Sequence, residues 1–522
     1  MNKTCLLAKP GGARDEITKK VSSLASSSPS RVPPFIAVLA CLLIAGCAVG
    51  PDFKKPAPPA VNDYTASPLK ATVATKNVAG GEAQRFAKGS DIPADWWTLF
   101  HSKALNALIE RSLTSNPDLK AAQAALSVAR ENVLAQRGAY YPSIAGSVSA
   151  NRQQQSTLLA PAPNYPVVAN EFQYNLFTPQ VSVSYVPDVF GLNRRTMESL
   201  RAQEQAVRFQ MIATQITLST NVVVAAVQEA SLQAQIDATR ELIDINAKMV
   251  RILRYQLAKG YAGRLDVAAQ ESQLGQVKAA LPPLLKQLAQ QHHLMAILAG
   301  RFPSQAPAEK FELSGLTLPQ DLPLSLPSQL VAQRPDVLQA EANLHAASAQ
   351  IGVATANRLP NIALTADIGS TALAIGQVFK AGTGFWDLGV AVAAPIFQGG
   401  KLLHQERAAK AAYVQAAEQY RSTVLTAFQN VADTLAALEQ DAQGLKASAV
   451  AADAAKVTLE LSQRQWKDGY ASYLSLLSAE QTDQQARINL VQAEANRYAD
   501  TAALFQALGG GWWHRSDLTQ AN

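Results

Sequence analysis

Two long parts of the sequence have the apolar spacing and composition of α-helices. Proline is absent from residues 191–281 and from residue 396 to the end of the chain, and Ala, Gln, Leu, Glu and Arg dominate both runs. Gly260 and Gly469 are the only convincing breaks. At about 1.5 Å per residue, a helix of about 65 to 70 residues extends roughly 100 Å. The pattern therefore predicts an elongated protein built on long helical hairpins.

Apolar residues gather on one side of each predicted long helix. Their spacing of three and four residues, together with many small Ala side chains, predicts coiled-coil-like packing. The residues concerned are Val222, Val223, Ala226 and Ala230 in the first run, and Leu425, Phe428, Val431, Leu435 and Leu438 in the second. An ordinary long helical bundle would show the same spacing, so the helices alone leave both architectures open.

Between the helical runs, shorter segments alternate apolar residues with small or polar ones. Residues 181–185, 362–368 and 388–394 do so clearly, and residues 144–149 more weakly. A dyad repeat over about ten residues is typical of membrane β-barrel strands, although a soluble two-stranded ribbon would look alike. We expect four strands per chain, at about 142–155, 172–190, 360–374 and 385–398.

Four strands are too few to enclose a pore, and an open sheet edge cannot face lipid because its backbone groups would go unpaired. The predicted barrel must therefore be shared among several chains, which makes the protein an obligate oligomer. Two or three protomers would supply about eight or twelve strands, and only the larger barrel leaves an open lumen.

Two blocks of sequence recur in the same order. Residues 116–144 align without a gap on residues 334–362. The matching residues are Pro117, Asp118, Ala122, Leu126, Pro142 and Ile144 with Pro335, Asp336, Ala340, Leu344, Pro360 and Ile362, and, at another offset, Gly260, Tyr261, Ala262, Leu265, Glu271 and Gly300 with Gly469, Tyr470, Ala471, Leu474, Glu480 and Gly509. We therefore predict one unit of about 210 residues used twice.

The N-terminal segment has the pattern of a secretory signal. Lys19, Lys20 and Arg31 precede an apolar run at residues 35–44, and small residues follow before Cys47. The run is short for a membrane span, so a retained anchor is the weaker alternative. Once the signal is removed, only Cys47 remains of the three cysteines. An internal disulfide is then impossible, and stability must come from packing.

These features divide the chain into six predicted segments. Residues 1–46 are a signal peptide, and residues 47–95, rich in Pro, Ala, Lys and Thr without a regular period, are an extended tether. The remaining segments are a first repeat at 96–310, a linker at 311–333, a second repeat at 334–510 with a hairpin tip near 466–474, and a C-terminal tail at 511–522.

Composition and charge exclude several classes of protein. With 48% hydrophobic residues the chain is not disordered. Residues 1–46 carry six basic and two acidic residues, which accounts for four of the six net positive charges. The remainder is nearly neutral and lacks nucleic-acid motifs, so we expect no nucleic-acid partner. No phosphate-binding loop, nucleophile elbow or metal-ligand spacing occurs in the sequence. We therefore expect no enzymatic activity, no catalytic residue, no metal and no cofactor.

Several short motifs stand out along the chain. Residues 43–47 resemble a lipobox that ends at Cys47, and residues 47–56 read CAVGPDFKKP. The other pieces are WWTLF at 96–100, NPDL at 116–119, RPDV at 334–337 and PIFQGG at 395–400. In their order and spacing, these motifs resemble the outer-membrane factor family, which is TolC-like, in its NodT-type lipoprotein subgroup. Ala48 after Cys47 favours sorting to the outer membrane in the resembled system.

The resemblance implies a mixed α and membrane-β fold. Three chains would share a twelve-stranded barrel in the outer membrane, which continues into a long α-helical barrel across the periplasm. It implies an acylated Cys47, a homotrimer, contact with outer-membrane lipids, a periplasmic adaptor protein at the helix tips and an inner-membrane pump of the resistance-nodulation-division type. The adaptor-contacting tips would be Gly260, Tyr261 and Ala262, and Gly469, Tyr470 and Ala471.

The resemblance also places a periplasmic gate after the second tip, where the family motif often reads YLxLLDAQR. This chain has YLSLLSAEQ at residues 473–481. Ser478 stands at the usual acid and Gln481 at the usual basic residue, so a ring of carboxylates at this level is not expected. We expect Leu474 to form a hydrophobic constriction with Ser478 lining it. Asp266 on the first hairpin either supplies a charge or an inter-helix contact there, or is a solvated acid at a helix start.

The function implied is a passive exit duct for small molecules such as drugs, in a tripartite efflux pump. Two alternatives remain at the level of the sequence. One is an exit duct for type I protein secretion, and the other is a structural periplasmic coiled-coil lipoprotein.

Overall fold

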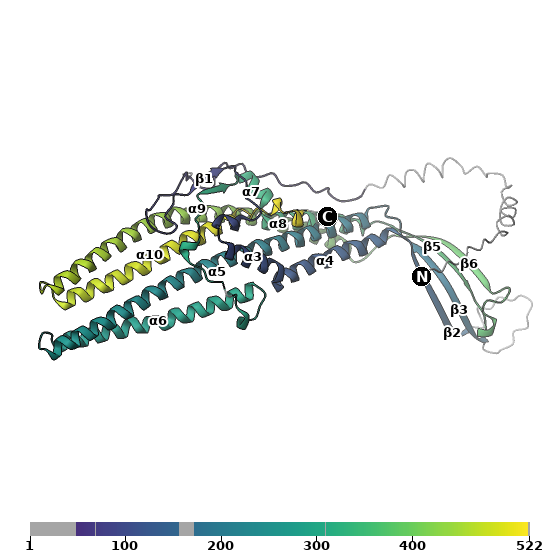
Figure 1. Ribbon diagram of the computed structural model, residues 1–522. Coiled ribbons are helices and arrows are strands. Elements are labelled where there is room, and N and C mark those ends of the chain that lie inside the picture. Colours follow the sequence, from purple (N-terminus) through teal and green to yellow (C-terminus); the bar gives the residue numbers. More distant parts are fainter. Residues whose placement is uncertain (1–47, 68, 156–171, 308, 520–522) are drawn as a thin grey trace, which may run out of the picture.

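The computed structural model describes residues 48–67, 69–155, 172–307 and 309–519. The predicted signal peptide and Cys47 lie outside the described residues. The molecule is elongated, with four β-strands at one end, two helical hairpins projecting at the other, and shorter elements packed around the middle (Figure 1).

The two helical hairpins account for most of the length. The first consists of α5 (Leu192–Ala258) and α6 (Arg264–Leu298), and the second of α9 (Lys401–Lys467) and α10 (Tyr473–Ala507). α5 and α9 each contain 67 residues, so each extends about 100 Å. The predicted elongation is confirmed. α6 stays helical through Pro282 and Pro283, which lie inside it.

α9 packs through a seam in which buried residues recur every three or four positions, as in a coiled coil. Val431, Leu435 and Leu438 lie on this seam, as predicted. Leu425 does not, because Val424 occupies the seam position and Leu425 is 65% exposed. The prediction for Leu425 was therefore wrong. On α5, the predicted residues Val222, Val223, Ala226 and Ala230 are all buried.

The four strands form one antiparallel sheet in the order β2-β3-β5-β6. They are β2 (Ser143–Gln155), β3 (Phe172–Tyr185), β5 (Asn361–Ser370) and β6 (Gly384–Ala393). β3 ends five residues before the predicted limit and β6 also ends five residues early, because Pro187 and Pro395 follow and proline has no backbone N–H to donate. β5 ends at Ser370 rather than near 374.

The remaining elements surround the middle of the hairpins (Figure 1). The helices are η1 (Trp96–Phe100), α3 (Lys103–Ser115), α4 (Pro117–Arg137), α7 (Pro327–Gln333), α8 (Pro335–Ala356) and α11 (Ser516–Thr519), and a small parallel sheet pairs β1 (Arg85–Lys88) with β4 (Asp321–Leu324). In each half of the chain, a helix (α4 or α8) is followed by two strands, a helix of 67 residues and a helix of 35 residues.

The largest apolar core lies at this middle level. Trp96 of η1 is fully buried and stacks on Phe505 of α10, with ring centroids 5.1 Å apart. Phe100 and Tyr498 pack beside them at 6.4 Å. Burying several large aromatic side chains supplies much of the stability of such a core. The WWTLF motif thus serves packing.

Two segments predicted to be connectors belong to this core. Residues 48–95 are extended, but they lie against the helices and do not hang free: Gln84 and Ile92 are fully buried. The predicted linker at 311–333 contains β4 and α7 and buries Leu318 and Leu322. A buried arginine holds the first segment, since Arg497 of α10 donates hydrogen bonds to the carbonyls of Gly80 and Glu82.

Trp512, in the predicted C-terminal tail, is a packing anchor. Its indole Nε1 donates a hydrogen bond of 2.7 Å to the carbonyl of Gln333, and its ring contacts Phe209 edge-on at 5.9 Å.

Candidate functional site: the hairpin tips, the gate face and the strand wall

The two hairpin tips are built alike. Gly260 and Gly469 both have φ of +78°, a left-handed conformation that favours glycine at the end of a helix. The next residue closes the turn in each case: the N–H of Tyr261 donates to the carbonyl of Gln256, and that of Tyr470 to the carbonyl of Gln465, both at 2.8 Å. The matching Gly-Tyr-Ala sequences therefore form matching helix caps.

The tips present two exposed aromatic side chains at the far end of the molecule. Tyr261 is 83% exposed and Tyr470 is 88% exposed, while Ala262 and Ala471 are half-buried beneath them. Large aromatic side chains exposed on two tips at the same end of the molecule mark a candidate binding surface. The structure therefore places the six predicted tip residues at two adjacent surfaces suited to a protein partner.

The predicted gate residues of α10 lie along one exposed face of that helix. Leu474 is 70% exposed, and Ser478 and Gln481 are also exposed. Positions 474, 478 and 481 are four and three residues apart, so they share one side of the helix. Their neighbours Tyr473, Leu476 and Leu477 turn inward instead.

Ser478 and Gln481 line a groove of about 620 Å³ between α9 and α10, and all of its lining residues are uncharged. Gln481 Nε2 also donates a hydrogen bond of 2.7 Å to Gln273 Oε1, which joins α10 to α6 of the other hairpin. The position that carries the basic residue in the resembled motif thus forms an uncharged contact between hairpins.

Asp266 does not join this face. Its Oδ2 accepts a hydrogen bond of 3.0 Å from the N–H of Gly263, at the first turn of α6. A carboxylate there caps the helix and is stabilised by the helix dipole. Of the two interpretations left open by the sequence, the structure favours the helix-start acid.

Sequence reasoning missed two buried carboxylates behind the gate face. Glu480 is 2% exposed and Asp483 is 1% exposed. Neither oxygen of Glu480 has a hydrogen-bond partner, and burial raises the pKa of Glu480 to about 7. Asp483 forms an ion pair of 2.9 Å with Arg487.

Comparison of the two aligned repeats shows that Glu480 has lost a basic partner. Its counterpart Glu271 lies at the surface and pairs with Arg254 at 2.7 Å. The residue that corresponds to Arg254 in the second hairpin is Gln463. Glu480 therefore lacks the arginine that neutralises its counterpart.

The four-stranded sheet has one apolar and one polar face. Residues opposite each other in antiparallel strands share a face, so the pairings place Val181, Ile368 and Trp386 together in one row. Ile144, Val183, Ala366 and Leu388 form the next row of the same face. Ile368, Trp386 and Leu388 are 65 to 73% exposed. Such a face is suited to lipid.

The opposite face carries small and polar side chains. One row places Ser182 beside Asp367 and Asp387, and the next contains Ser184 and Thr365. α5 has an apolar stretch long enough to cross a membrane, but 67% of that stretch is buried inside the protein. The apolar surface available to a membrane is therefore that of the strands.

A protein-family model described as outer membrane efflux protein matches residues 108–300 and 326–510. The chain belongs to the outer membrane efflux protein family. Membership confirms the predicted family, the location in the outer membrane and the role as the channel component of an efflux system. It argues against the purely structural lipoprotein, because the members of this family are transport conduits.

Similar proteins span nearly the whole chain. The sequence is 29% identical over 484 residues to the probable efflux pump outer membrane protein TtgC of Pseudomonas putida, which covers 92% of this chain and 95% of that protein. It is 27% identical over 485 residues to the outer membrane protein OprJ of Pseudomonas aeruginosa. This match covers 91% of this chain and 95% of OprJ.

The fold is also that of a solved outer membrane channel. The crystal structure of the Campylobacter jejuni CmeC outer membrane channel matches with a TM-score of 0.79 at 20% identity, covering 91% of this chain and 97% of that one. The family match, the sheet with one apolar face and the long hairpins therefore all indicate an outer membrane channel.

Proposed function

We propose that three copies of this chain form the passive exit duct of a tripartite efflux pump, through which small molecules such as drugs leave the cell. A periplasmic adaptor binds the hairpin tips, and an inner-membrane pump of the resistance-nodulation-division type supplies the energy. The observation that carries the proposal is the sheet at one end of the molecule, with one apolar face, one polar face and two unpaired edges.

The unpaired edges require other chains. β2 and β6 are the outer strands of the sheet, and an edge cannot face lipid without leaving its N–H and C=O groups unsatisfied. Three copies of a four-stranded sheet give a barrel of about twelve strands, which is wide enough for a lumen lined by the polar face.

A second surface supports assembly with copies of the same chain. Exposed apolar side chains follow one stripe of α9, at Val414, Leu425, Val450 and Val457, each 54 to 65% exposed. The intervals of 11, 25 and 7 residues are close to whole helical turns, so these residues share one side. A neighbouring helix of a second copy would bury them in a continuous helical wall.

The two halves of the chain make equivalent contributions in this proposal. Each half has the same order of elements, and the matched residues of the two tips have matching geometry. An internal repeat explains this, and it gives each protomer two strand pairs and two hairpins around the duct axis.

Acylation of Cys47 is part of the proposal. The lipobox at residues 43–47 carries it, and Ala48, the first described residue, lies beside Gly191 at the junction of strands and helices. Radioactive palmitate should label the wild-type protein and leave a Cys47→Ser variant unlabelled.

Deletion and complementation test the efflux role. Loss of the gene should raise drug accumulation in the cell, and the wild-type gene should restore efflux. A Leu425→Glu variant should restore it poorly and should lack the heat-resistant oligomer on a gel. Unchanged drug accumulation together with loss of a secreted protein from the medium would instead indicate type I secretion.

A further inference from the structure

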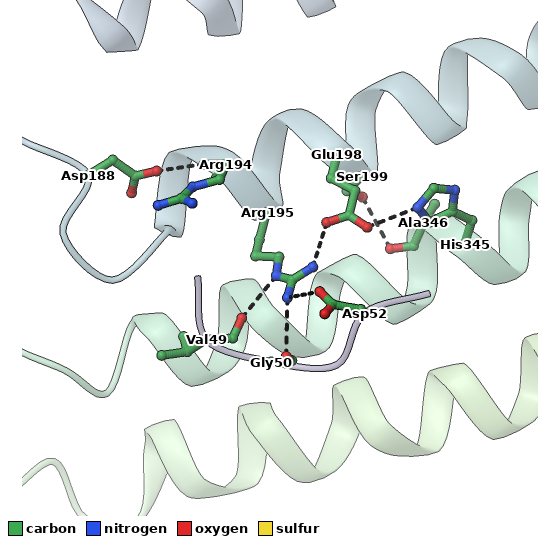
Figure 2. A network of polar contacts seen from close by, with 10 residues as sticks. All are labelled: Val49, Gly50, Asp52, Asp188, Arg194, Arg195, Glu198, Ser199, His345 and Ala346. Carbon is green, nitrogen blue, oxygen red and sulfur yellow. Dashed lines mark hydrogen bonds and ion pairs between the residues drawn. The ribbon is translucent and has the colours of Figure 1, made fainter. Parts of the chain in front are cut away.

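The efflux role makes no use of a polar network around Arg195, in the first turn of α5 (Figure 2). The Arg195 side chain is only 6% exposed, and it holds the start of the described chain. Its Nε donates to the carbonyl of Val49 at 3.0 Å, and its Nη2 donates to the carbonyl of Gly50 at 3.1 Å and to Asp52 Oδ1 at 2.9 Å. One buried guanidinium thus binds three groups within four residues of an extended segment.

Further contacts come from both helices that flank the segment. Glu198 of α5 accepts from Arg195 Nη1 at 2.8 Å, and its other oxygen lies 2.9 Å from His345 Nε2 of α8. The His345 ring stacks on Phe53, with centroids 4.3 Å apart and planes 11° apart. Lys55 forms an ion pair of 3.0 Å with Glu341, also on α8. The segment therefore touches α5 and α8 together.

The backbone of the segment packs directly against the backbones of α8 and of the start of α5. Gly50 has φ of +95°, and a Cβ on it would lie 2.4 Å from the Cα of Gly352 on α8. A Cβ on Gly191 would lie 2.6 Å from that of Ala48. Glycine at these positions lets the chain approach both helices. The N–H of Val49 also donates to the carbonyl of Phe190 at 3.1 Å.

α5 and α8 adjoin the central joint of the sheet. α5 follows β3, and α8 precedes β5. The β3–β5 pairing runs only from Gln180–Gly369 to Tyr185–Leu364, whereas β2 and β3 pair from Ser143–Ser184 to Gln155–Phe172. The joint between the two strand pairs is thus the shortest in the sheet. It ends at Tyr185, five residues before Phe190, whose carbonyl accepts the hydrogen bond from Val49.

We propose that residues 48–56 are a structural clasp, which Arg195 binds so that the N-terminal segment joins α5 to α8 and stabilises the β3–β5 joint. The clasp also fixes the position of the lipid anchor, because Cys47 Cα lies about 3.8 Å from that of Ala48. Only this second point rests on the acylation proposed above. The anchor is then rigidly attached to the duct at the strand–helix junction.

Proteolysis of the full-length protein in detergent tests the clasp. Trypsin can cut the Lys54–Lys55 bond, whereas Pro56 protects the bond after Lys55. Cleavage at Lys54 should be slow in the wild type and at least about tenfold faster in Arg195→Gln, because loss of a buried charge-assisted network costs more than 1.4 kcal/mol, the equivalent of a tenfold change. Arg201→Gln, an exposed arginine on the same helix, is the matched control and should cleave at the wild-type rate.

A second variant guards against misfolding of Arg195→Gln. Gly50→Ala changes only the segment, and it should release the segment because of the close approach to Gly352. Asp188 still caps α5 in both variants, through its bonds to the N–H groups of Asn193 and Arg194. In both variants, hydrogen exchange should quicken at the β3–β5 amides and stay unchanged along β2–β3.

Three results would overturn the proposal. Wild-type cleavage rates in both variants would mean that Arg195 does not hold the segment. Faster cleavage with unchanged β3–β5 exchange would mean that the segment positions the anchor without stabilising the sheet. If Cys47→Ser, exported with a non-lipoprotein signal, were cleaved as fast as Arg195→Gln, the lipid rather than Arg195 would hold the segment. Failure of acylation alone would leave the cleavage results of Arg195→Gln and Gly50→Ala unchanged.

Discussion

Asp367 of β5 and Asp387 of β6 lie directly opposite each other on the polar face of the sheet. Ser182 of β3 donates a hydrogen bond to Asp367 Oδ1 in the same row. Like charges directly opposite each other destabilise an antiparallel pair. Their presence on the face that lines the proposed lumen suggests that the pair shapes the field inside the barrel.

Asp387→Asn should reduce the preference of the channel for cations. Three copies would place about six carboxylates in one ring, and acidic rings favour cations in pores. The reversal potential in a potassium chloride gradient should be cation-selective for the wild type and move toward zero in the variant. Asp95→Asn, which removes an exposed acid outside the strands, should leave it unchanged. Equal reversal potentials in all three proteins would contradict a lumen-facing pair.

Glu480 should make the packing behind the gate face sensitive to pH. Burial raises the pKa of Glu480 from 4.5 to about 7, so the folded protein keeps a proton that the unfolded chain releases within this range. Local stability should therefore fall as the pH rises from about 4.5 to about 7, and stay level above that. This change in the pKa of Glu480 corresponds to on the order of 3 kcal/mol of local stability.

Hydrogen exchange at the tips of α6 and α10, corrected for intrinsic rates, measures this effect. Protection should be lower at pH 8 than at pH 5 in the wild type, and nearly independent of pH in Glu480→Gln. Glu271→Gln, the surface counterpart, should keep the wild-type response. If Glu480→Gln also kept it, another group would be responsible.

Replacing Tyr261 and Tyr470 by alanine should weaken binding of the periplasmic adaptor and leave the fold intact. Both side chains are exposed beyond the helix caps, and neither ring contributes to the cores. Loss of two aromatic anchors at an interface typically costs about 2 kcal/mol or more, roughly a thirtyfold loss of affinity. Binding to the purified adaptor can be measured by calorimetry. Phe302→Ala removes an aromatic side chain that is 75% exposed away from the tips, and it should bind normally.

Periodicity predicted the long helices and much of the seam, since a coiled coil repeats its buried positions. It misplaced Leu425, because a spacing of three and four residues admits Val424 equally well. The alternation of apolar with small or polar residues predicted the strands, and Pro187 and Pro395 then decided where β3 and β6 end. Motif resemblance supplied the family and the tip residues, and the geometry at Gly260 and Gly469 explains why those sequences match.

The N-terminal segment and the buried carboxylates could not be predicted in this way. Arg195 and Arg497 bind the N-terminal segment at the backbone carbonyls of Val49, Gly50, Gly80 and Glu82, and such contacts leave no period in its sequence. Glu480 has the same aligned position as the exposed Glu271, so its burial depends on how the two hairpins pack. Asp266 could be assigned only once its bond to Gly263 was seen.

Single-channel conductance of the purified protein in a planar bilayer tests most directly the claim of a gated duct. The exposed side chain of Leu474 is the proposed constriction, and Leu265 is its counterpart on the first hairpin, which is also exposed. The account predicts a small resting conductance that increases in Leu474→Ala and stays small in Leu265→Ala. Folded protein that shows no conductance as wild type or as Leu474→Ala would contradict it.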